Sequence, residues 1–300
     1  MSVPSCDSLS RLRRKRGRCL PRPFLKWAGG KVQLLRDLLA FVPSSFGAYH
    51  EPFVGGGALF FALHRAGRLE NRKVHLSDAN PELVTTYRAI RDDVDAVMAL
   101  LARHRHDRDH FYAVRAQDPA SLSPAEQAAR MIFLNKTGFN GLYRVNQSGR
   151  FNVPFGRHKN PTICDRENLL AVARALQGVE VTCEDFETVL SRAQSGDFTY
   201  FDPPYVPLSR TANFTSYARE GFDLPDQERL AQVFGALARR QVAVMLSNSD
   251  TPWVRERYRD FHQVHLLARR HVNCRANGRA AVGERLVLSY VERQENQVER

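Results

Sequence analysis

Predicted strands and helices alternate along this chain, and the alternation constrains its fold more than any other feature. Apolar runs at 48–54 and 73–78 are predicted strands, and each precedes a segment whose apolar residues recur at helical spacing. A further helix is expected before them, over 31–41. Strand–helix–strand units of this length are typical of a parallel sheet covered by helices.

The alternation stops once and then resumes. Between 92 and 164, helical sequence passes into a segment rich in glycine, asparagine and arginine. The strands expected after this break are short apolar runs: 179–185, 197–202, 242–248 and the two arms of a closing hairpin, 262–270 and 285–291. With a helix over 226–239, this order predicts one doubly wound α/β sheet that carries a separate module between its second and third strands.

The chain is strongly basic, and the charge is uneven. Lysine and arginine number 44 against 32 acidic residues, which gives a net charge of +12 and a pI near 9.9. Such an excess indicates a polyanionic partner, of which nucleic acid is the leading candidate. Seven basic residues lie in 1–22 against Asp7 alone, so half of the net charge belongs to a segment that we expect to be a disordered tail.

Several function classes are disfavoured by composition. No run approaches the ~20 apolar residues of a membrane span, and the first residues lack the apolar stretch of a signal peptide. The five cysteines are scattered and never form a CxxC pair, which argues against a disulfide framework and a structural zinc site. We therefore expect a cytoplasmic protein with no membrane partner and no metal. We also expect it to act as a monomer, although composition does not bear on its oligomeric state.

A glycine turn follows the first predicted strand. In EPFVGGG (51–57) the glycines let a ligand approach the backbone and the N-terminus of the next helix. Because Phe60 occupies the third glycine position of GxGxxG, a dinucleotide enzyme is disfavoured. Asp78 ends the second strand, where a carboxylate either accepts both ribose hydroxyls or caps the following helix. Together these features indicate a nucleoside-bearing cofactor without a pyrophosphate.

The most specific motif is DPPY, which comprises Asp202, Pro203, Pro204 and Tyr205 and directly follows a predicted strand. The two prolines remove two backbone donors and leave their carbonyls free as acceptors. Asp202 adds a carboxylate acceptor, and Tyr205 adds a ring for stacking. These groups suit a planar heterocycle whose amino group donates to Asp202 and to the Pro203 carbonyl.

A second segment, FLKWAGGK (24–31), places Trp27 and Lys31 around two glycines at a helix start. There the indole can close over a cofactor. The lysine does not belong to a phosphate-binding loop, because the pattern GxxxxGKS/T is absent.

Seven segments occur in the order of one enzyme family, and the resemblance that they carry extends over almost all of the chain from Pro23 to Val291: FLKWAGGK, EPFVGGG, LSDAN, LNKTGFNGLYRVNQSGRFNVPFG, CEDF, DPPY and SRTANFTSY. In these segments the sequence resembles the adenine-specific DNA methyltransferases, and among them the DNA adenine methylases that act on GATC. The resemblance implies the Rossmann-like sheet of class I S-adenosylmethionine-dependent methyltransferases with an inserted, mainly helical DNA-recognition module. It also implies methyl transfer from S-adenosylmethionine to N6 of adenine in double-stranded DNA.

The resemblance further implies roles for individual residues, with DPPY as the catalytic motif. The residues at cofactor-binding positions are Trp27, Lys31, Asp78 and Asp202. Asp185 and Phe186 are expected to flank the adenine of the cofactor. The residues at DNA-binding positions are Lys26, Phe139, Asn140, Leu142, Arg144, Pro154 and Arg157.

The inserted segment is expected to read the DNA sequence. Arg144 suits a bidentate contact with guanine, and Leu142 suits a contact with a thymine methyl group. Phe139 is expected to wedge into the base stack beside an extruded adenine, and Asn140 to pair with exposed base edges. The family usually has tyrosine at position 139, so this chain keeps the stacking ring and lacks the hydroxyl.

The resemblance divides the chain into a tail (1–22), a catalytic domain (23–91 and 165–300) and a target-recognition domain (92–164). Three alternatives stay open. Methylation of the cytosine amine uses a similar pocket but goes with serine before PPY, and glutamine methylation in proteins goes with Asn-Pro-Pro-Tyr. A catalytically inactive DNA-binding protein on the same scaffold is disfavoured by the intact DPPY, and a cofactor titration would distinguish it.

Overall fold

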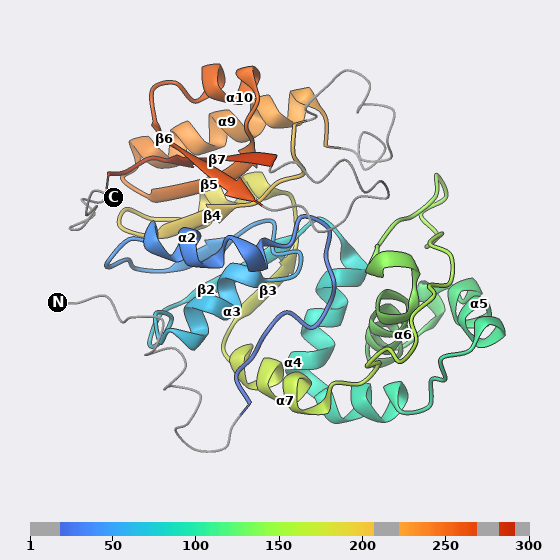
Figure 1. Cartoon of the computed structure of the whole chain (residues 1–300). Coiled ribbons are helices and arrows are strands. Elements are labelled where there is room, and N and C mark those ends of the chain that lie inside the picture. The colour runs from blue at the N-terminus through green and yellow to red at the C-terminus, as the bar shows by residue number, and fades with distance from the viewer. Residues whose placement is uncertain (1–18, 207–221, 269–281, 292–300) are drawn as a thin grey trace, which may run out of the picture. The chain divides into compact units, whose positions relative to one another are not determined.

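The computed structural model describes residues 19–206, 222–268 and 282–291, and the elements given below belong to this part of the chain (Figure 1). Residues 1–18, which form most of the predicted tail, and the segment SRTANFTSY lie outside the described residues.

The last residues of the predicted tail are held in place. The Pro21 carbonyl accepts a hydrogen bond from Arg65 at 2.8 Å. Arg22 N donates to Asn168 at 3.0 Å, and the Arg22 guanidinium pairs with Asp165 at 2.6 Å. The disorder predicted for 1–22 is therefore wrong for Pro21 and Arg22, because backbone and side-chain partners far along the chain fix both residues.

Seven strands form one sheet in the order β3-β2-β1-β4-β5-β7-β6 within the described residues. Their bounds are β1 Tyr49–Glu51, β2 Val74–Asp78, β3 Glu180–Cys183, β4 Phe198–Phe201, β5 Ala243–Ser249, β6 His262–Ala268 and β7 Val282–Leu288. Strands β1 to β5 are parallel to one another, whereas β7 is antiparallel to its neighbours β5 and β6. The predicted doubly wound sheet and closing hairpin are confirmed, and the second arm of the hairpin, β7, inserts between β5 and β6.

Helices connect these strands. The α-helices are α2 Leu35–Ala40, α3 Ala58–Arg65, α4 Pro81–Leu101, α5 Arg108–Ala116, α6 Pro124–Thr137, α7 Arg166–Ala175, α8 Val189–Arg192, α9 Leu224–Arg239 and α10 Pro252–Arg257. The 3-10 helices are η1 Lys31–Gln33, η2 Pro119–Ser121, η3 Phe139–Gly141 and η4 Phe186–Thr188. The helix predicted over 31–41 is split into η1 and α2, and Leu34 at the junction makes no side-chain capping bond. None of the described helices is long and apolar enough to span a bilayer.

The hydrophobic core on one side of the sheet explains why the strands are continuously apolar in sequence. All four residues of β4 are buried, and Phe201 packs with Leu246 and Val287 of neighbouring strands against Leu230 and Phe234 of α9. Figure 1 shows α9 and α10 on one side of the sheet and α2 and α3 on the other. A parallel strand that is covered on both faces has no polar face, so its sequence is continuously apolar.

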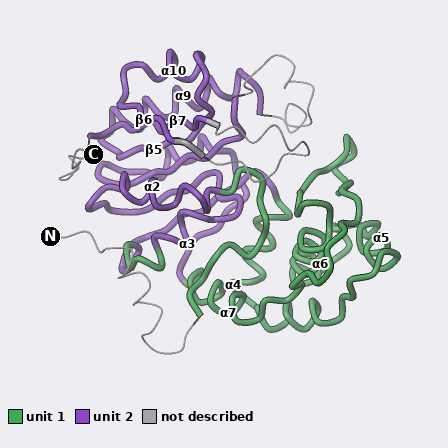
Figure 2. Tube along the Cα trace, viewed as in Figure 1, with its two compact units in different colours: residues 1–30, 64–68, 81–177 green, residues 31–63, 69–80, 178–300 purple. Residues whose placement is uncertain are grey.

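The chain forms two compact units (Figure 2). Unit 1 comprises residues 1–30, 64–68 and 81–177, and unit 2 comprises residues 31–63, 69–80 and 178–300. Unit 2 contains the sheet, and unit 1 contains α4, α5, α6 and α7. The predicted insertion after the second strand is confirmed, because β2 ends at Asp78 and β3 begins only at Glu180.

In unit 1, α4 packs against α6 and α7. α4 is interrupted at Asp93, whose backbone is not helical and whose carboxylate accepts a hydrogen bond from Ala96 N at 3.0 Å. The predicted recognition domain, 92–164, begins beside this interruption and lies within unit 1, which also includes 81–91. The assignment of functional domains stays a prediction.

Candidate active site

The carboxyl ends of three neighbouring parallel strands carry the chemically distinctive residues of unit 2. Asp78 is the last residue of β2, Glu51 is the last residue of β1, and Asp202 directly follows β4. The strand order reverses between β1 and β4. Open α/β sheets bind their ligands outside the carboxyl ends of the strands at such a reversal, so this edge is the candidate site.

Lys31 and Asp202 form an ion pair at this edge. Lys31 Nζ lies 2.8 Å from Asp202 Oδ1, with 3% of the lysine side chain exposed and 20% of the aspartate side chain. The same Nζ lies 4.6 Å from the centre of the Tyr205 ring, and the Tyr205 hydroxyl donates to Glu284 of β7 at 2.8 Å. The structure therefore joins the lysine of FLKWAGGK to DPPY and adds Glu284, which the sequence analysis missed.

Burial sets the proton affinity of Asp202. Desolvation raises the pKa of this carboxyl to about 6, because it outweighs the attraction of the Lys31 ammonium. The carboxylate is therefore ionised at neutral pH and is a strong, partly desolvated acceptor. It becomes protonated, and therefore neutral, in mildly acidic solution.

A chain of amide side chains holds the double proline. Gln227 of α9 donates to the Pro204 carbonyl at 2.7 Å, and its own amide oxygen accepts from Asn248 at 3.0 Å. The Asn248 amide oxygen accepts from Val206 N at 3.1 Å. The expectation that both proline carbonyls are free is therefore wrong for Pro204, whose carbonyl fixes the loop. The predicted acceptor role falls to the Pro203 carbonyl.

Asp78 is oriented by two backbone donors. One carboxylate oxygen accepts from Gly55 N and the other from Asn80 N, both at 3.0 Å. Desolvation nevertheless raises the pKa of Asp78 to about 6. Gly55 and Gly57 adopt φ values of 45° and 64°, which glycine reaches at little cost. The glycine turn and Asp78, predicted as separate features, are thus one hydrogen-bonded unit.

Glu51 is a further buried carboxyl that the sequence analysis did not single out. Its side chain is 2% exposed and accepts a hydrogen bond from the Tyr49 hydroxyl at 2.8 Å. Desolvation, assisted by the negative charge of Asp202, raises the pKa of Glu51 to about 8. Most of this carboxyl is therefore protonated at neutral pH. The available signal was a glutamate inside the otherwise apolar strand 48–54.

An aromatic cluster follows the same strand ends. Phe53 stacks on Phe186 with ring centroids 5.4 Å apart, and Phe222 contacts both rings. Phe186 is 4% exposed and lies 4.8 Å from the Arg229 guanidinium. Asp185, which was predicted to flank a cofactor together with Phe186, pairs with Arg229 at 2.9 Å. Their cofactor role stays a prediction.

Unit 1 contains an open pocket formed largely by predicted DNA-binding residues. It has a volume of about 490 Å³ and is lined by Phe139, Asn140, Phe155, Arg157 and His158. Phe139 is 45% exposed. Its backbone N–H donates to the Pro154 carbonyl at 2.9 Å, and Asn140 has a φ of 55°. The turn after α6 therefore presents an aromatic ring outward.

Arg144 lies beyond this turn, at the base of a short hairpin-like segment. Its Nε donates to Asn152 Oδ1 at 2.7 Å, and Asn152 N donates to the Arg144 carbonyl at 2.9 Å. The guanidinium is exposed, whereas Leu142 is half-buried. Asn152 thus orients Arg144 without covering it.

Asn135 of α6 ties Lys26 to the same turn. Its amide exchanges hydrogen bonds with the backbone of Lys26 at 2.8 and 2.7 Å, and it also donates to the Gly141 carbonyl at 2.8 Å. Gly141 has a φ of 64°, and a Cβ there would approach the Lys26 side chain to 2.4 Å. Trp27 follows Lys26 and stacks on Tyr143 with ring centroids 5.5 Å apart.

The model of one protein family matches most of the chain. It is described as D12 class N6 adenine-specific DNA methyltransferase and covers residues 27–272. The chain belongs to this family. Its reaction is therefore methylation of N6 of adenine in DNA, with S-adenosylmethionine as the methyl donor. Family membership confirms the adenine-specific enzyme expected from DPPY and sets aside the cytosine, glutamine and inactive alternatives.

Individual relatives agree with this assignment. Type II methyltransferase M1.LlaDCHI of Lactococcus lactis subsp. cremoris is 40% identical, over 90% of this chain and 95% of its own. Type II methyltransferase M.MjaIII of Methanocaldococcus jannaschii is 39% identical, over 90% of this chain and 99% of its own. The DNA adenine methylase of Escherichia coli is 35% identical, over 89% and 95%.

The residues of unit 2 fit the methyl donor chemically. S-adenosylmethionine carries ribose hydroxyls and an ammonium group, which donate hydrogen bonds. The carboxylates that end β2 and follow β4, Asp78 and Asp202, are acceptors oriented by Gly55 N and by Lys31. The glycine turn carries no side chains at positions 55–57, so a ligand can approach the backbone there.

Methyl transfer by the D12 methyltransferase is expected to fail in mild acid. The pKa values of Asp78 and Asp202 are both about 6, so both carboxylates gain protons below that value. If both must be ionised, kcat/KM for S-adenosylmethionine falls about 100-fold per pH unit well below pH ~6, because each proton contributes about tenfold. A pH profile at saturating DNA measures this slope.

One control variant accompanies the pH profile. Asp78→Asn removes one titrating group and should reduce the limiting slope to about tenfold per pH unit. Because burial raises both pKa values, protonation favours the folded state, so these two carboxyls add stability as the pH falls from about 6 toward 4. A profile that stays flat to about pH 5 in folded enzyme would show that neither carboxylate needs its charge.

Proposed function

We propose that this D12 methyltransferase methylates adenine within GATC in double-stranded DNA and acts on a base rotated out of the duplex. The observation that carries the proposal is the 45% exposure of Phe139 beside Asn140 and Arg157. Apolar side chains that wedge between base pairs stand exposed in the free protein. The amino group of a stacked, paired adenine is closed to in-line attack, so the base has to leave the helix.

The proposed catalytic residues are Asp202, Pro203, Pro204 and Tyr205. The adenine amine donates to Asp202 and to the Pro203 carbonyl, which favours a pyramidal nitrogen whose lone pair is free to attack. The Gln227 bond to the Pro204 carbonyl keeps this loop in one shape, and the Tyr205 ring offers the base a stacking surface. Holding the nitrogen in line with the methyl group supplies much of the acceleration.

The proposed mechanism needs no strong general base. S-adenosylmethionine supplies the activated methyl group when bound. The nitrogen becomes acidic once it carries the methyl group and then loses its proton, so no strong base acts before attack. Asp202, already ionised at neutral pH, is one acceptor for that proton.

The proposed cofactor-binding residues are Trp27, Lys31, Asp78 and Asp202. Asp78 accepts the ribose hydroxyls, and Asp202 accepts from the ammonium group of the cofactor. Lys31 acts on the cofactor through Asp202, which it holds at 2.8 Å. Trp27 covers the cofactor in this proposal, as the resemblance implies.

GATC reading is proposed for the inserted domain, 92–164. Arg144 contacts guanine, Leu142 contacts a thymine methyl group, and Asn140 pairs with the bases that the extruded adenine leaves behind. The remaining DNA contacts are Lys26, Pro154 and Arg157. The presence of DNA adenine methylase among the relatives supports this choice of site. We further propose that the enzyme acts as a monomer in the cytoplasm, with the basic tail adding nonspecific affinity for DNA.

The test is to methylate a mixed-sequence DNA library with purified enzyme and S-adenosylmethionine and to map every modified base. We expect N6-methyladenine confined to GATC. Methyladenine in another sequence would refute the GATC proposal and leave the family assignment intact. Base flipping is measured separately with 2-aminopurine at the target position, whose fluorescence should rise on binding because the base unstacks.

A further inference from the structure

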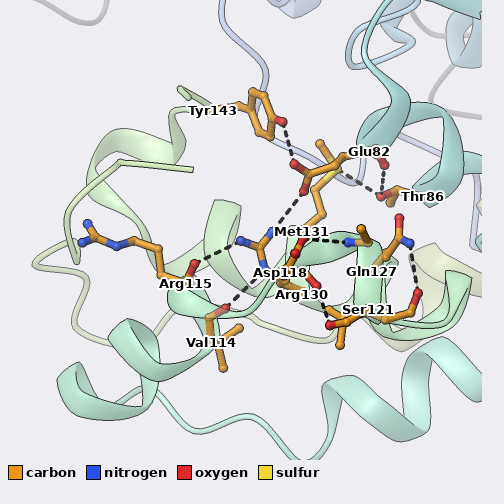
Figure 3. A network of polar contacts seen from close by, with 12 residues as sticks. Glu82, Thr86, Val114, Arg115, Asp118, Ser121, Gln127, Arg130, Met131 and Tyr143 are labelled. Atoms are coloured by element: carbon orange, nitrogen blue, oxygen red, sulfur yellow. Dashed lines mark hydrogen bonds and ion pairs between the residues drawn. The ribbon is translucent and has the colours of Figure 1, made fainter. Parts of the chain in front are cut away.

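A buried ion pair in unit 1 anchors the proposed DNA-reading segment (Figure 3). Arg130 of α6 is 3% exposed, and its Nη1 lies 3.0 Å from Glu82 Oε2. Its Nε and Nη2 donate to the carbonyls of Val114 and Arg115, each at 3.2 Å. All three guanidinium nitrogens are thus engaged, and moving either charge would leave the other buried without its partner.

Glu82 extends this ion pair to Tyr143. The second carboxylate oxygen of Glu82 accepts from the Tyr143 hydroxyl at 3.1 Å. The Glu82 carbonyl accepts from Thr86 Oγ1 at 2.7 Å, and the same hydroxyl contacts Met131 Sδ at 3.0 Å. Figure 3 shows Tyr143 directed toward Glu82, with Arg130 on the far side of the carboxylate. The Tyr143 hydroxyl is therefore hydrogen-bonded to α4 through Glu82, whose other oxygen pairs with Arg130 of α6.

The ring of Tyr143 touches two other aromatic side chains. It stacks on Trp27, with centroids 5.5 Å apart and planes 25° apart, and it contacts Phe151 at 5.8 Å. Tyr143 stands in the sequence between Leu142 and Arg144. One side chain thus connects the segment proposed to read bases with the tryptophan proposed to contact the cofactor.

We propose that Tyr143 is a positioning residue that couples DNA binding to cofactor binding. The proposal rests on the proposed function, in which Leu142 and Arg144 contact DNA and Trp27 contacts the cofactor. DNA that fixes Leu142 and Arg144 also fixes the residue between them, and the stacked ring then restricts Trp27. A cofactor that meets an already ordered indole loses less conformational freedom on binding, so its affinity rises. The coupling is reciprocal, because it is one free energy shared by two sites.

The experiment measures that coupling directly. S-adenosylhomocysteine, the demethylated cofactor, is titrated by calorimetry into the free enzyme and into enzyme saturated with a duplex that carries the mapped target site. The ratio of the two Kd values is the coupling factor. We expect wild-type enzyme to bind the probe about fivefold or more tightly when DNA is present.

Three variants identify the route. Tyr143→Leu removes the stacked ring and should bring the coupling factor below about twofold. Tyr143→Phe keeps the ring between Trp27 and Phe151 and should retain the wild-type factor to within about twofold. Tyr112→Leu is the matched control, since Tyr112 of α5 is likewise half-buried in unit 1 and lies 4.7 Å from Arg115. It should leave the factor unchanged.

The ratio of the two Kd values distinguishes a positioning role of Tyr143 from a purely structural one. A general loss of folded protein lowers the binding of the probe equally with and without DNA, so it leaves the ratio unchanged. A coupling factor near one in wild-type enzyme would overturn the proposal, as would a wild-type factor in Tyr143→Leu. Equal losses in Tyr143→Phe and Tyr143→Leu would overturn it too, because the ring would then not be the route. The proposed cofactor contact of Trp27 is tested separately. If it is wrong, a Trp27→Leu variant binds S-adenosylhomocysteine with unchanged affinity.

Discussion

Replacing Asp202 with asparagine should lower kcat by roughly 10³-fold or more, because the amide keeps the shape of the carboxylate and loses its charge. Asp202 adjoins the Pro203 carbonyl and is paired with Lys31 at 2.8 Å. Its loss removes the acceptor that holds the adenine amine. Asp202→Ala should abolish transfer as well. The measurement is single-turnover transfer at saturating cofactor and DNA, with circular dichroism of each variant.

Asp197 provides a matched control at the other end of β4. Asp197 precedes β4 and Asp202 follows it, so the two carboxylates lie at opposite ends of this four-residue strand. Asp197 accepts hydrogen bonds from Ala48 N and Gln194 N at 2.7 and 2.9 Å and is hydrogen-bonded to His50 Nε2 at 3.1 Å. Asp197→Asn should lower the melting temperature through these lost contacts and leave kcat nearly unchanged. A folded Asp202→Asn enzyme with kcat within about tenfold of wild type would contradict the catalytic assignment.

Replacing Arg144 with alanine should relax sequence choice at one base pair. A bidentate contact with guanine is worth about 1–3 kcal/mol of discrimination, which corresponds to a roughly 5- to 150-fold loss against near-cognate sites. The guanidinium is exposed and held by Asn152 at 2.7 Å, which is suited to reading a base edge. The measurement compares kcat/KM on GATC with kcat/KM on sites that differ at each position in turn.

Arg150 offers the matched control for Arg144. It is also exposed and belongs to the same hairpin-like segment, where its backbone N–H donates to Asn146 at 2.9 Å. Arg150→Ala should lower kcat/KM on all DNA sequences alike or leave it unchanged. If Arg150 contacts a phosphate, its loss affects every sequence equally, because a phosphate contact carries no base preference. A uniform loss across all sites in Arg144→Ala would reassign Arg144 to the DNA backbone. Affinity for S-adenosylhomocysteine without DNA should stay at the wild-type value in both variants.

The failed expectations share a cause. The prolines were expected to leave two free carbonyls, and the Pro204 carbonyl is bonded to Gln227, 23 residues away. Pro21 and Arg22 were assigned to a disordered tail because their neighbours are basic, and they bond to residues far along the chain. Glu51 was passed over although it stands inside a predicted strand, because the sequence does not show how deeply its carboxyl is buried. For Pro204, Pro21 and Arg22 the deciding partner is distant in sequence.

Sequence alone determined the alternation of strands and helices, the point of insertion and the positions of Asp78 and Asp202 at strand ends. Periodicity and composition carry that information, because a buried parallel strand must be apolar and its end must turn. Only the tertiary structure decided that β7 inserts between β5 and β6, that Lys31 pairs with Asp202 and that Tyr143 stacks on Trp27. These features depend on which surfaces meet and how much water they exclude, and desolvation and pairing energies exist only once the chain has folded.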